Sequence, residues 1–346
     1  SFSGCSDLVS LPPLTGIVEL QDKSFANCRA LTAIHCGPNL TAIYMDCFMG
    51  CTMLETFSTD AHDYFISGEA FLQCTSLKNF DFSRPAEILN NAFEACESLD
   101  IIDMSQSSMQ YLNDQVFQDC GALKSVILPP NLTQFSLRTF DGCNIQSLTF
   151  TGTDGVLELD KTFVLYDGNL SEVIFYPDCD VVLTETFVGC DSLTRVVLPT
   201  KPYILESTFI HCSNLIKVEK LDYCTSIISG FAYCSNLTQI DSLASLTILG
   251  DQAFFNCFSL ISLPPLPLIT TIGNHCFTGC RLLKSIDCGN ELTTIGSGAF
   301  TNCTHLESFT GGSNSLVVNS TAFAYCHSLS TFPFSKVHQI GSEAVQ

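Results

Sequence analysis

The sequence has no tryptophan and few charged residues, which make up 14% of its 346 residues. Cations are especially scarce, because 14 lysines and arginines stand against 35 aspartates and glutamates, giving a formal net charge of −21. Phosphate backbones and anionic lipids are held by clustered cations, so we expect no nucleic acid among the partners and no binding to bare membrane. Polar low-complexity tracts are also missing, and we expect the chain to fold throughout.

Long apolar runs and catalytic motifs are absent as well. No run reaches the roughly 18 residues that a membrane helix needs. No basic-then-apolar leader precedes Ser1, so we expect no membrane insertion by this segment and place any leader or anchor outside it. The sequence contains no G-x-G-x-x-G, P-loop or G-x-S-x-G motif. We therefore expect a protein that is not an enzyme and uses no cofactor.

The sequence contains instead a repeat of 22 to 24 residues whose first marker is phenylalanine. The phenylalanines in this register are Phe2, Phe25, Phe48, Phe71, Phe93, Phe117, Phe140, Phe163, Phe187, Phe209, Phe231, Phe254, Phe277, Phe300 and Phe323. A cysteine stands three residues after each of them, except after Phe163, where Tyr166 takes its place. Such regular recurrence predicts a stack of repeated units rather than a globular domain.

Each repeat follows the template Phe-x-x-Cys-x-x-Leu-x-x-Ile. Counted from the phenylalanine as zero, apolar residues at +9 and +11 enclose an outward residue at +10, which predicts a short strand at about +7 to +11. A second apolar pair, such as Leu40 and Ile43, follows a turn that often holds proline and leads back toward the next phenylalanine.

The regular spacing predicts that each coil buries its Phe, Cys, Leu and Ile against the same residues of the coils above and below. Core pairs of this kind are Phe25 with Cys28, Phe48 with Cys51, Phe71 with Cys74, Phe254 with Cys257, and Phe300 with Cys303. No coil could hold this core alone, so the stability is that of a one-dimensional stack. We predict an α/β repeat solenoid, a right-handed superhelix of about fifteen coils, with one parallel strand per coil on its inner face and a turn or short helix at each Phe-x-x-Cys.

Residues 1–346 are predicted to form a single solenoid. The stretch 144–182 departs from the template, because one residue is missing after Cys143 and Phe163 lacks its cysteine. The phenylalanine spacing stays at 23 and 24 across it, which indicates a local irregularity and not a domain boundary. The first and last repeats lack the polar caps usual in solenoids, so we expect a stretch of a longer array.

Two segments carry a resemblance to a known family. The patterns Leu193-x-x-Val-x-Leu-Pro and Leu292-Thr-Thr-Ile-Gly-x-x-Ala-Phe-x-x-Cys303 resemble the BspA-type leucine-rich repeat, and the resemblance covers the whole chain. It implies a leucine-rich-repeat superhelix that is secreted or surface-attached in bacteria or parasitic protists, where several members are linked to adhesion. Its defining residues all belong to the core, so it transfers no ligand-contact positions.

The resemblance favours an extracellular or cell-surface protein that adheres to a protein or glycan ligand on a host cell or matrix through the solenoid surface. The alternative is a structural protein that associates end to end into surface fibres or layers. The twenty cysteines fall at apolar or small positions, which predicts buried free thiols, with a few disulfides as the alternative. The pairs Cys47-x-x-x-Cys51 and Cys276-x-x-x-Cys280 lack zinc spacing and a histidine partner, so we expect no metal site.

An acidic row at the outward +10 position is the candidate binding site. It consists of Asp81, Asp103, Glu219, Asp241 and Asp287. Stacked coils lie about 4.8 Å apart, so carboxylates on adjacent coils would repel unless they are solvated, bound by a cation or met by a basic partner. We expect a solvated polar face, with partner or calcium binding as the alternative.

Six N-x-S/T sequons are candidate glycosylation sites, provided that the source is eukaryotic. Their asparagines are Asn39, Asn131, Asn169, Asn236, Asn302 and Asn319.

Overall fold

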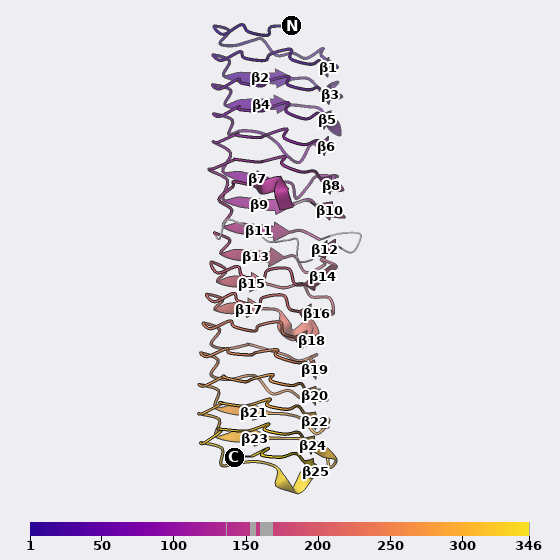
Figure 1. Ribbon diagram of the computed structural model, residues 1–346. Coiled ribbons are helices and arrows are strands. Elements are labelled where there is room, and N and C mark those ends of the chain that lie inside the picture. The colour runs from indigo at the N-terminus through magenta and orange to yellow at the C-terminus, as the bar shows by residue number, and fades with distance from the viewer. Residues whose placement is uncertain (136, 153–156, 160–168, 346) are drawn as a thin grey trace. The chain divides into compact units, whose positions relative to one another are not determined.

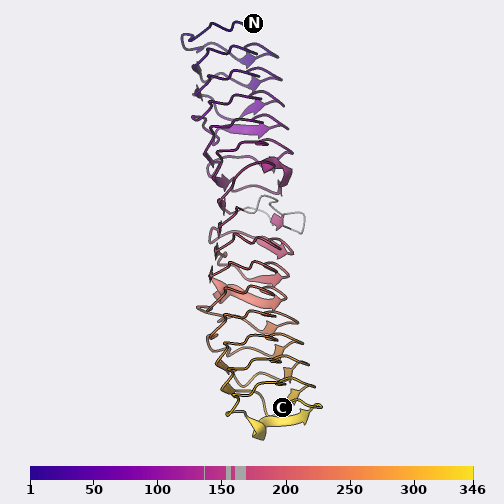
Figure 2. The same ribbon diagram turned by 60° about the vertical axis from the view of Figure 1, so that its left-hand side comes forward.

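The computed structural model describes residues 1–135, 137–152, 157–159 and 169–345 (Figure 1). It divides into two compact units, of which one takes in Ser1–Leu157 and the other Ser171–Gln346. Within each unit the coils lie one above another, as the turned view shows as well (Figure 2). The expected irregularity at 144–182 includes Phe163 and Tyr166, which lie outside the described residues.

A first parallel ladder is formed by the strands that the +9 and +11 alternation predicts, which are labelled on the left of Figure 1. In the first unit they are β2 (Ala33–Cys36) with β4 (Thr56–Thr59), and β7 (Ile101–Asp103), β9 (Ser125–Leu128) and β11 (Ser147–Phe150) in that order. In the second unit they are β13 (Glu172–Phe175), β15 (Arg195–Val197) and β17 (Lys217–Glu219), and β21 (Ser285–Asp287) with β23 (Ser308–Thr310). The predicted parallel solenoid is confirmed by this pairing.

A second parallel ladder runs along the other side of the coils, and the prediction of one strand per coil was incomplete. In the first unit it contains β1 (Glu19–Leu20), β3 (Ala42–Ile43), β5 (Tyr64–Ile66) and β6 (Pro85–Ile88), then a separate pair, β8 (Tyr111–Leu112) and β10 (Gln134–Phe135). In the second unit it contains β14 (Val181–Thr184), β16 (Tyr203–Glu206), β18 (Cys224–Ile228), β19 (Ile248–Leu249), β20 (Thr271–Ile272), β22 (Thr294–Ile295), β24 (Leu316–Val318) and β25 (Val337–Ile340). Many of these strands are two residues long, too short for an alternating pattern to show in the sequence.

Helix is limited, in the described part of the chain, to three 3-10 turns: η1 (Leu137–Phe140), η2 (Leu221–Tyr223) and η3 (Phe334–Lys336). One further short strand, β12 (Leu157–Leu159), falls where one unit gives way to the next along the chain. No helix among the described residues has the length and hydropathy of a membrane span.

The phenylalanines of the repeat stack on one another inside the coils, as their spacing predicts. In the first unit the ring centroids of Phe48 and Phe71 lie 5.0 Å apart, with an interplanar angle of 17°. In the second unit Phe254 and Phe277 lie 5.4 Å apart at 3°. These four side chains are fully buried. Each ring therefore contributes both its buried area and its stacking to the contact between adjacent coils.

The cysteines of the repeat make a contact that explains why this position is not leucine. The Sγ of Cys51 donates a hydrogen bond to the backbone oxygen of Phe25 in the preceding coil, at 3.0 Å. Cys257 does the same to Phe231, also at 3.0 Å. A thiol is small enough for the narrow space and is a weak donor, so it occupies an apolar site and still satisfies a buried carbonyl.

The tight bend around each phenylalanine uses the left-handed backbone region on both sides of the ring. Around Phe25, Lys23 has a φ of 55° and Asn27 a φ of 59°. The position two residues after the phenylalanine is often glycine or asparagine, as at Gly50 with a φ of 70°, because these residues tolerate that conformation best. Each bend therefore fixes the direction in which the chain enters the first ladder.

Thiol reactivity tests the buried cysteine column. All twenty cysteines are free thiols, of which Cys5 is exposed and the other nineteen are buried. We expect only Cys5 to react readily with a thiol reagent at pH 8, and all twenty to react in denaturant without reductant. If most thiols stay unreactive after denaturation without reductant, the cysteine column is oxidised.

Burial also makes stability depend on alkaline pH. It raises the pKa of Cys36 from an ordinary value of 9.0 to about 11. As the pH rises, the thiol of Cys36 ionises in the unfolded chain before it ionises in the folded one. The contribution of the buried thiol to the free energy of unfolding is therefore complete below pH 9 and is lost as the pH rises toward 11. Urea titrations at a series of pH values should show the free energy of unfolding falling across this window.

Candidate functional site

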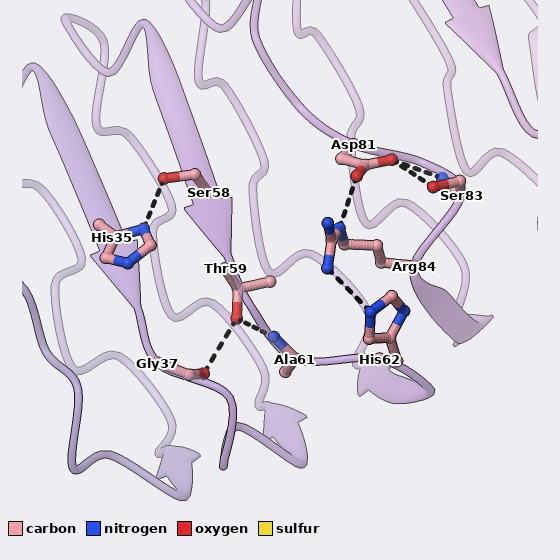
Figure 3. A network of polar contacts seen from close by, with 9 residues as sticks. All are labelled: His35, Gly37, Ser58, Thr59, Ala61, His62, Asp81, Ser83 and Arg84. Carbon is pink, nitrogen blue, oxygen red and sulfur yellow. Dashed lines mark hydrogen bonds and ion pairs between the residues drawn. The ribbon is translucent and has the colours of Figure 1, made fainter.

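The outward face of the first ladder carries the row that the sequence marked as a binding site. In its N-terminal coils the row runs from His35 on β2 to Ser58 on β4 and on to Asp81 (Figure 3). The Nδ1 of His35 and the Oγ of Ser58 lie 3.0 Å apart. Thr59 Oγ1 donates to the Gly37 oxygen at 3.2 Å and accepts from the Ala61 amide at 3.1 Å. These bonds hold the turn that follows the strands and so fix the row in place.

Asp81 forms an ion pair with an arginine of its own loop, and this cation offsets repulsion from neighbouring carboxylates. Arg84 Nε donates to Asp81 Oδ2 at 2.6 Å, and the backbone amide of Ser83 donates to Oδ1 at 3.1 Å (Figure 3). Partial burial raises the pKa of Asp81, but the hydrogen bonds from Ser83 and Arg84 outweigh it, and the pKa lies below its ordinary value. The Arg84 Nη1 also lies 3.1 Å from His62 Nε2. The carboxylate therefore stays ionised and oriented.

Asp103 and Asp81 are brought together at one hollow, with a volume of about 310 Å³. Asp103 lies at the end of β7, is exposed, and accepts a hydrogen bond from the Ser105 amide at 2.9 Å. Ile101, which is 58% exposed, also lines the hollow. The site thus combines one paired carboxylate, one carboxylate without an ion pair in the described residues, and an apolar side chain.

Glu219 belongs to a charged network rather than to an acidic pair. Its Oε1 accepts from Arg195 Nε at 2.9 Å and from Lys217 Nζ at 3.1 Å, and Arg195 also bonds Glu172 through Nη1. Partial burial raises the pKa of Glu219, but the bonds from Lys217 and Arg195 outweigh it and lower the pKa. Arg195 therefore lies between carboxylates from the strands on either side. Exposed pairs of this kind each contribute about 0–1 kcal/mol, so they orient charge more than they stabilise the fold.

The remaining acidic residues of the row are exposed, and neither of them is in an ion pair among the described residues. Asp241 lines a second hollow of about 360 Å³ together with Lys217 and Ile216. Asp287, at the end of β21, accepts a hydrogen bond from Thr310 Oγ1 at 2.8 Å. The five predicted residues therefore do not form one continuous acidic row: Asp81 and Asp103 share a hollow, while Glu219, Asp241 and Asp287 each have different polar surroundings.

Three contributors to this surface escaped the sequence analysis: Arg84, Arg195 and Lys217. The last two stand at the +8 position, which faces outward as +10 does because the side-chain period of a strand is two. That periodicity was the signal that could have found them. Arg84 lies beyond the strand, and only the turn geometry places it against Asp81.

Metal binding and glycosylation depend on how the candidate side chains are grouped and exposed. Among the described residues, no group of three or more His, Cys, Asp or Glu side chains is arranged to hold a metal ion. Of the sequon asparagines, Asn39, Asn169, Asn236 and Asn302 are exposed, while Asn131 and Asn319 are half-buried. Exposure makes the first four accessible, and their modification stays a prediction.

The chain matches the family of the BspA type leucine rich repeat region (6 copies). The matched segments are residues 1–100, 62–163, 86–216, 160–267 and 225–346. No curated protein matches the chain closely enough to count as a relative.

Two solved structures are similar to the chain over most of its length. A leucine-rich repeat protein from Bacteroides ovatus is 24% identical with a TM-score of 0.48, and the match covers 98% of this chain and 85% of that one. A leucine rich cell surface protein from Faecalibacterium prausnitzii is 20% identical with a TM-score of 0.40, and the match covers 96% and 87%.

Proposed function

The chain belongs to the BspA-type leucine-rich repeat family, and on that premise we propose that it is an extracellular or cell-surface recognition module. It binds a protein ligand on a host cell or matrix through the outward face of its first ladder. Family membership supports the location, and the face itself supports the binding role.

The contrast between inward and outward positions is the observation that carries this proposal. Inward positions repeat the same buried residues from coil to coil, whereas the outward +10 position changes from His35 to Ser58, Asp81 and Asp103 within four successive coils. A purely structural column has no need of such variety. Recognition of one partner requires varied residues, because specificity comes from a particular arrangement of charged and apolar groups.

The geometry of the charged groups adds a second reason. Arg195 is held from two sides by Glu172 and Glu219, and Asp81 is held by Arg84. Side chains that are already ordered lose less conformational entropy when a ligand binds. Charges on the face also steer the approach of a partner of complementary charge.

Charge reversal on the face tests the proposal. We expect Asp103→Lys combined with Asp241→Lys to weaken saturable binding to matrix-coated surfaces or cultured host cells at least about tenfold, or about 1.4 kcal/mol. The free energy of unfolding should change by less than about 0.5 kcal/mol per site, because neither carboxylate is in an ion pair among the described residues. Surface binding assays and urea titrations measure the two effects.

Glu97→Lys provides the matched control, since Glu97 is an exposed acid on the turn after Cys96 and not on the first ladder. It should leave binding unchanged. Equal loss in the control and the double variant would point to a non-specific charge effect and reject the face. The absence of saturable binding to any surface, with the chain forming long assemblies, would favour a structural protein of fibres or layers instead.

A further inference from the structure

The second ladder is interrupted within the first unit, between β6 and β8 (Figure 1). Its outward row runs in register from Phe65 to Glu87, and it resumes at Tyr111, which is paired with Gln134. A side chain bridges the interruption, because Asn113 Nδ2 donates to the backbone oxygen of Ile88 at 2.8 Å. The coils stay connected there, but their backbones do not form a continuous sheet.

A hollow of about 450 Å³ lies at this interruption, larger than either hollow on the first ladder. Tyr111 forms part of its lining and is 50% exposed. Around it stand Glu87, Asn90, Asp114 and Gln134. A half-exposed aromatic ring therefore borders a space lined by two carboxylates and three amides, of which the Asn113 amide is already bonded to Ile88. The volume is within the range of small-molecule sites.

The polar groups of this lining are available to a ligand. The side chains of Glu87, Asn90, Asp114 and Gln134 make no hydrogen bond or ion pair with any other described residue. Together they offer amide donors as well as amide and carboxylate acceptors. Ligands that match such a mixture carry groups that both donate and accept hydrogen bonds.

A neutral sugar has this chemistry. Each hydroxyl of a pyranose donates and accepts hydrogen bonds, while the axial C–H groups on one side of the ring form an apolar patch that fits an aromatic face such as that of Tyr111. The carboxylates of Glu87 and Asp114 would repel an anionic sugar. We propose that this hollow binds a neutral hexose or N-acetylhexosamine residue of a glycan.

This site goes beyond the proposed function, because it lies on the second ladder and does not use the charged face of the first. Tyr111 supplies the stacking surface. Asn90 and Gln134 supply the hydrogen bonds that orient the ring. The two binding activities are therefore separable by mutation.

Saturation-transfer NMR on the full chain tests the proposal. The probes are glucose, galactose, mannose, N-acetylglucosamine, N-acetylgalactosamine and lactose, with sialyllactose as the anionic comparison. We expect at least one neutral sugar to bind, lactose to bind more strongly than sialyllactose if it is the ligand, and Tyr111→Ala to weaken binding at least about tenfold. Tyr111→Phe, which keeps the ring, should retain most of the affinity.

Tyr325→Ala is the matched control, because Tyr325 is 56% exposed, belongs to the second unit and does not line the hollow. It should leave sugar binding unchanged. If Tyr111→Ala fails to fold in a thermal melt, Asn90→Ala and Gln134→Ala give the same readout from exposed positions. No binding by any neutral sugar, or binding that is insensitive to these variants, would overturn the proposal, whereas loss of matrix binding alone would bear only on the first ladder.

Discussion

Replacing Phe71 by alanine is expected to lower the free energy of unfolding by about 3–5 kcal/mol. The side chain is fully buried and stacks on Phe48 and Phe93, with ring centroids 5.0 Å away on each side. Phe57 and Phe80 also meet the ring edge-on, at 5.3 and 5.5 Å. The substitution therefore leaves a cavity that touches three successive coils, where the bulky aromatic neighbours, already packed against one another, cannot collapse to fill it.

Urea unfolding measures the total loss, and hydrogen exchange locates it. Because the fold is a stack of nearest-neighbour contacts, the amides of the coils next to Phe71 should lose protection first. The control is Phe258→Ala, since Phe258 is 40% exposed and lies 5.4 Å from the Arg281 guanidinium. Phe258→Ala should lower the free energy of unfolding by no more than about 1 kcal/mol. A comparable loss in both variants would mean that the stacked column is not the main source of stability.

Gly296→Ala is expected to destabilise the second unit by about 1–3 kcal/mol or more. A Cβ at this position would lie 2.4 Å from the backbone carbon of Gly273 in the preceding coil. A Cβ at Gly273 would lie equally close to the backbone carbon of Gly250, so this column of glycines lets three coils approach closely. The clash is with backbone atoms, and only a shift of a whole coil could relieve it.

Gly121→Ala is the control for this substitution, because a Cβ at Gly121 meets no atom within 4 Å. Restricting the unfolded chain should make the control neutral or stabilising by about 0.4–1 kcal/mol. Thermal and urea unfolding should therefore show a lower free energy of unfolding for Gly296→Ala and an equal or higher one for Gly121→Ala. If Gly296→Ala is as stable as the control, the close approach between the coils is not required.

The core and the first ladder could be predicted from the sequence because their signal recurs in every repeat. Phe71, Cys74 and their equivalents occupy one register, and a pattern repeated this often outweighs any local departure. The second ladder could not be predicted as strands, since pairs such as Ala42–Ile43 are too short to alternate. Their extended conformation depends on the coil above and below, which local sequence does not encode.

The candidate sites were predictable only in part, for a related reason. The sequence placed Asp81 and Asp103 on an outward row, but it could not show that Arg84 neutralises the first of them. The partners of Arg195 depend on the register between strands of different coils. The hollow at Tyr111 depends on two strands that do not pair, and no pattern within either strand signals that.

The hydrogen bond from each repeat cysteine to a phenylalanine carbonyl bears on how such genes can change length. Cys51 needs only the Phe25 oxygen of the neighbouring coil, and Phe48 in turn offers its oxygen to Cys74. In a duplicated segment of one full repeat, the cysteine thiol could donate to the phenylalanine carbonyl of the preceding coil, and the phenylalanine carbonyl could accept from the cysteine of the following coil. An insertion of a few residues would instead break the register of these bonds. Unequal recombination in steps of whole repeats is therefore tolerated, and the number of outward positions available for recognition can grow without any redesign of the interior.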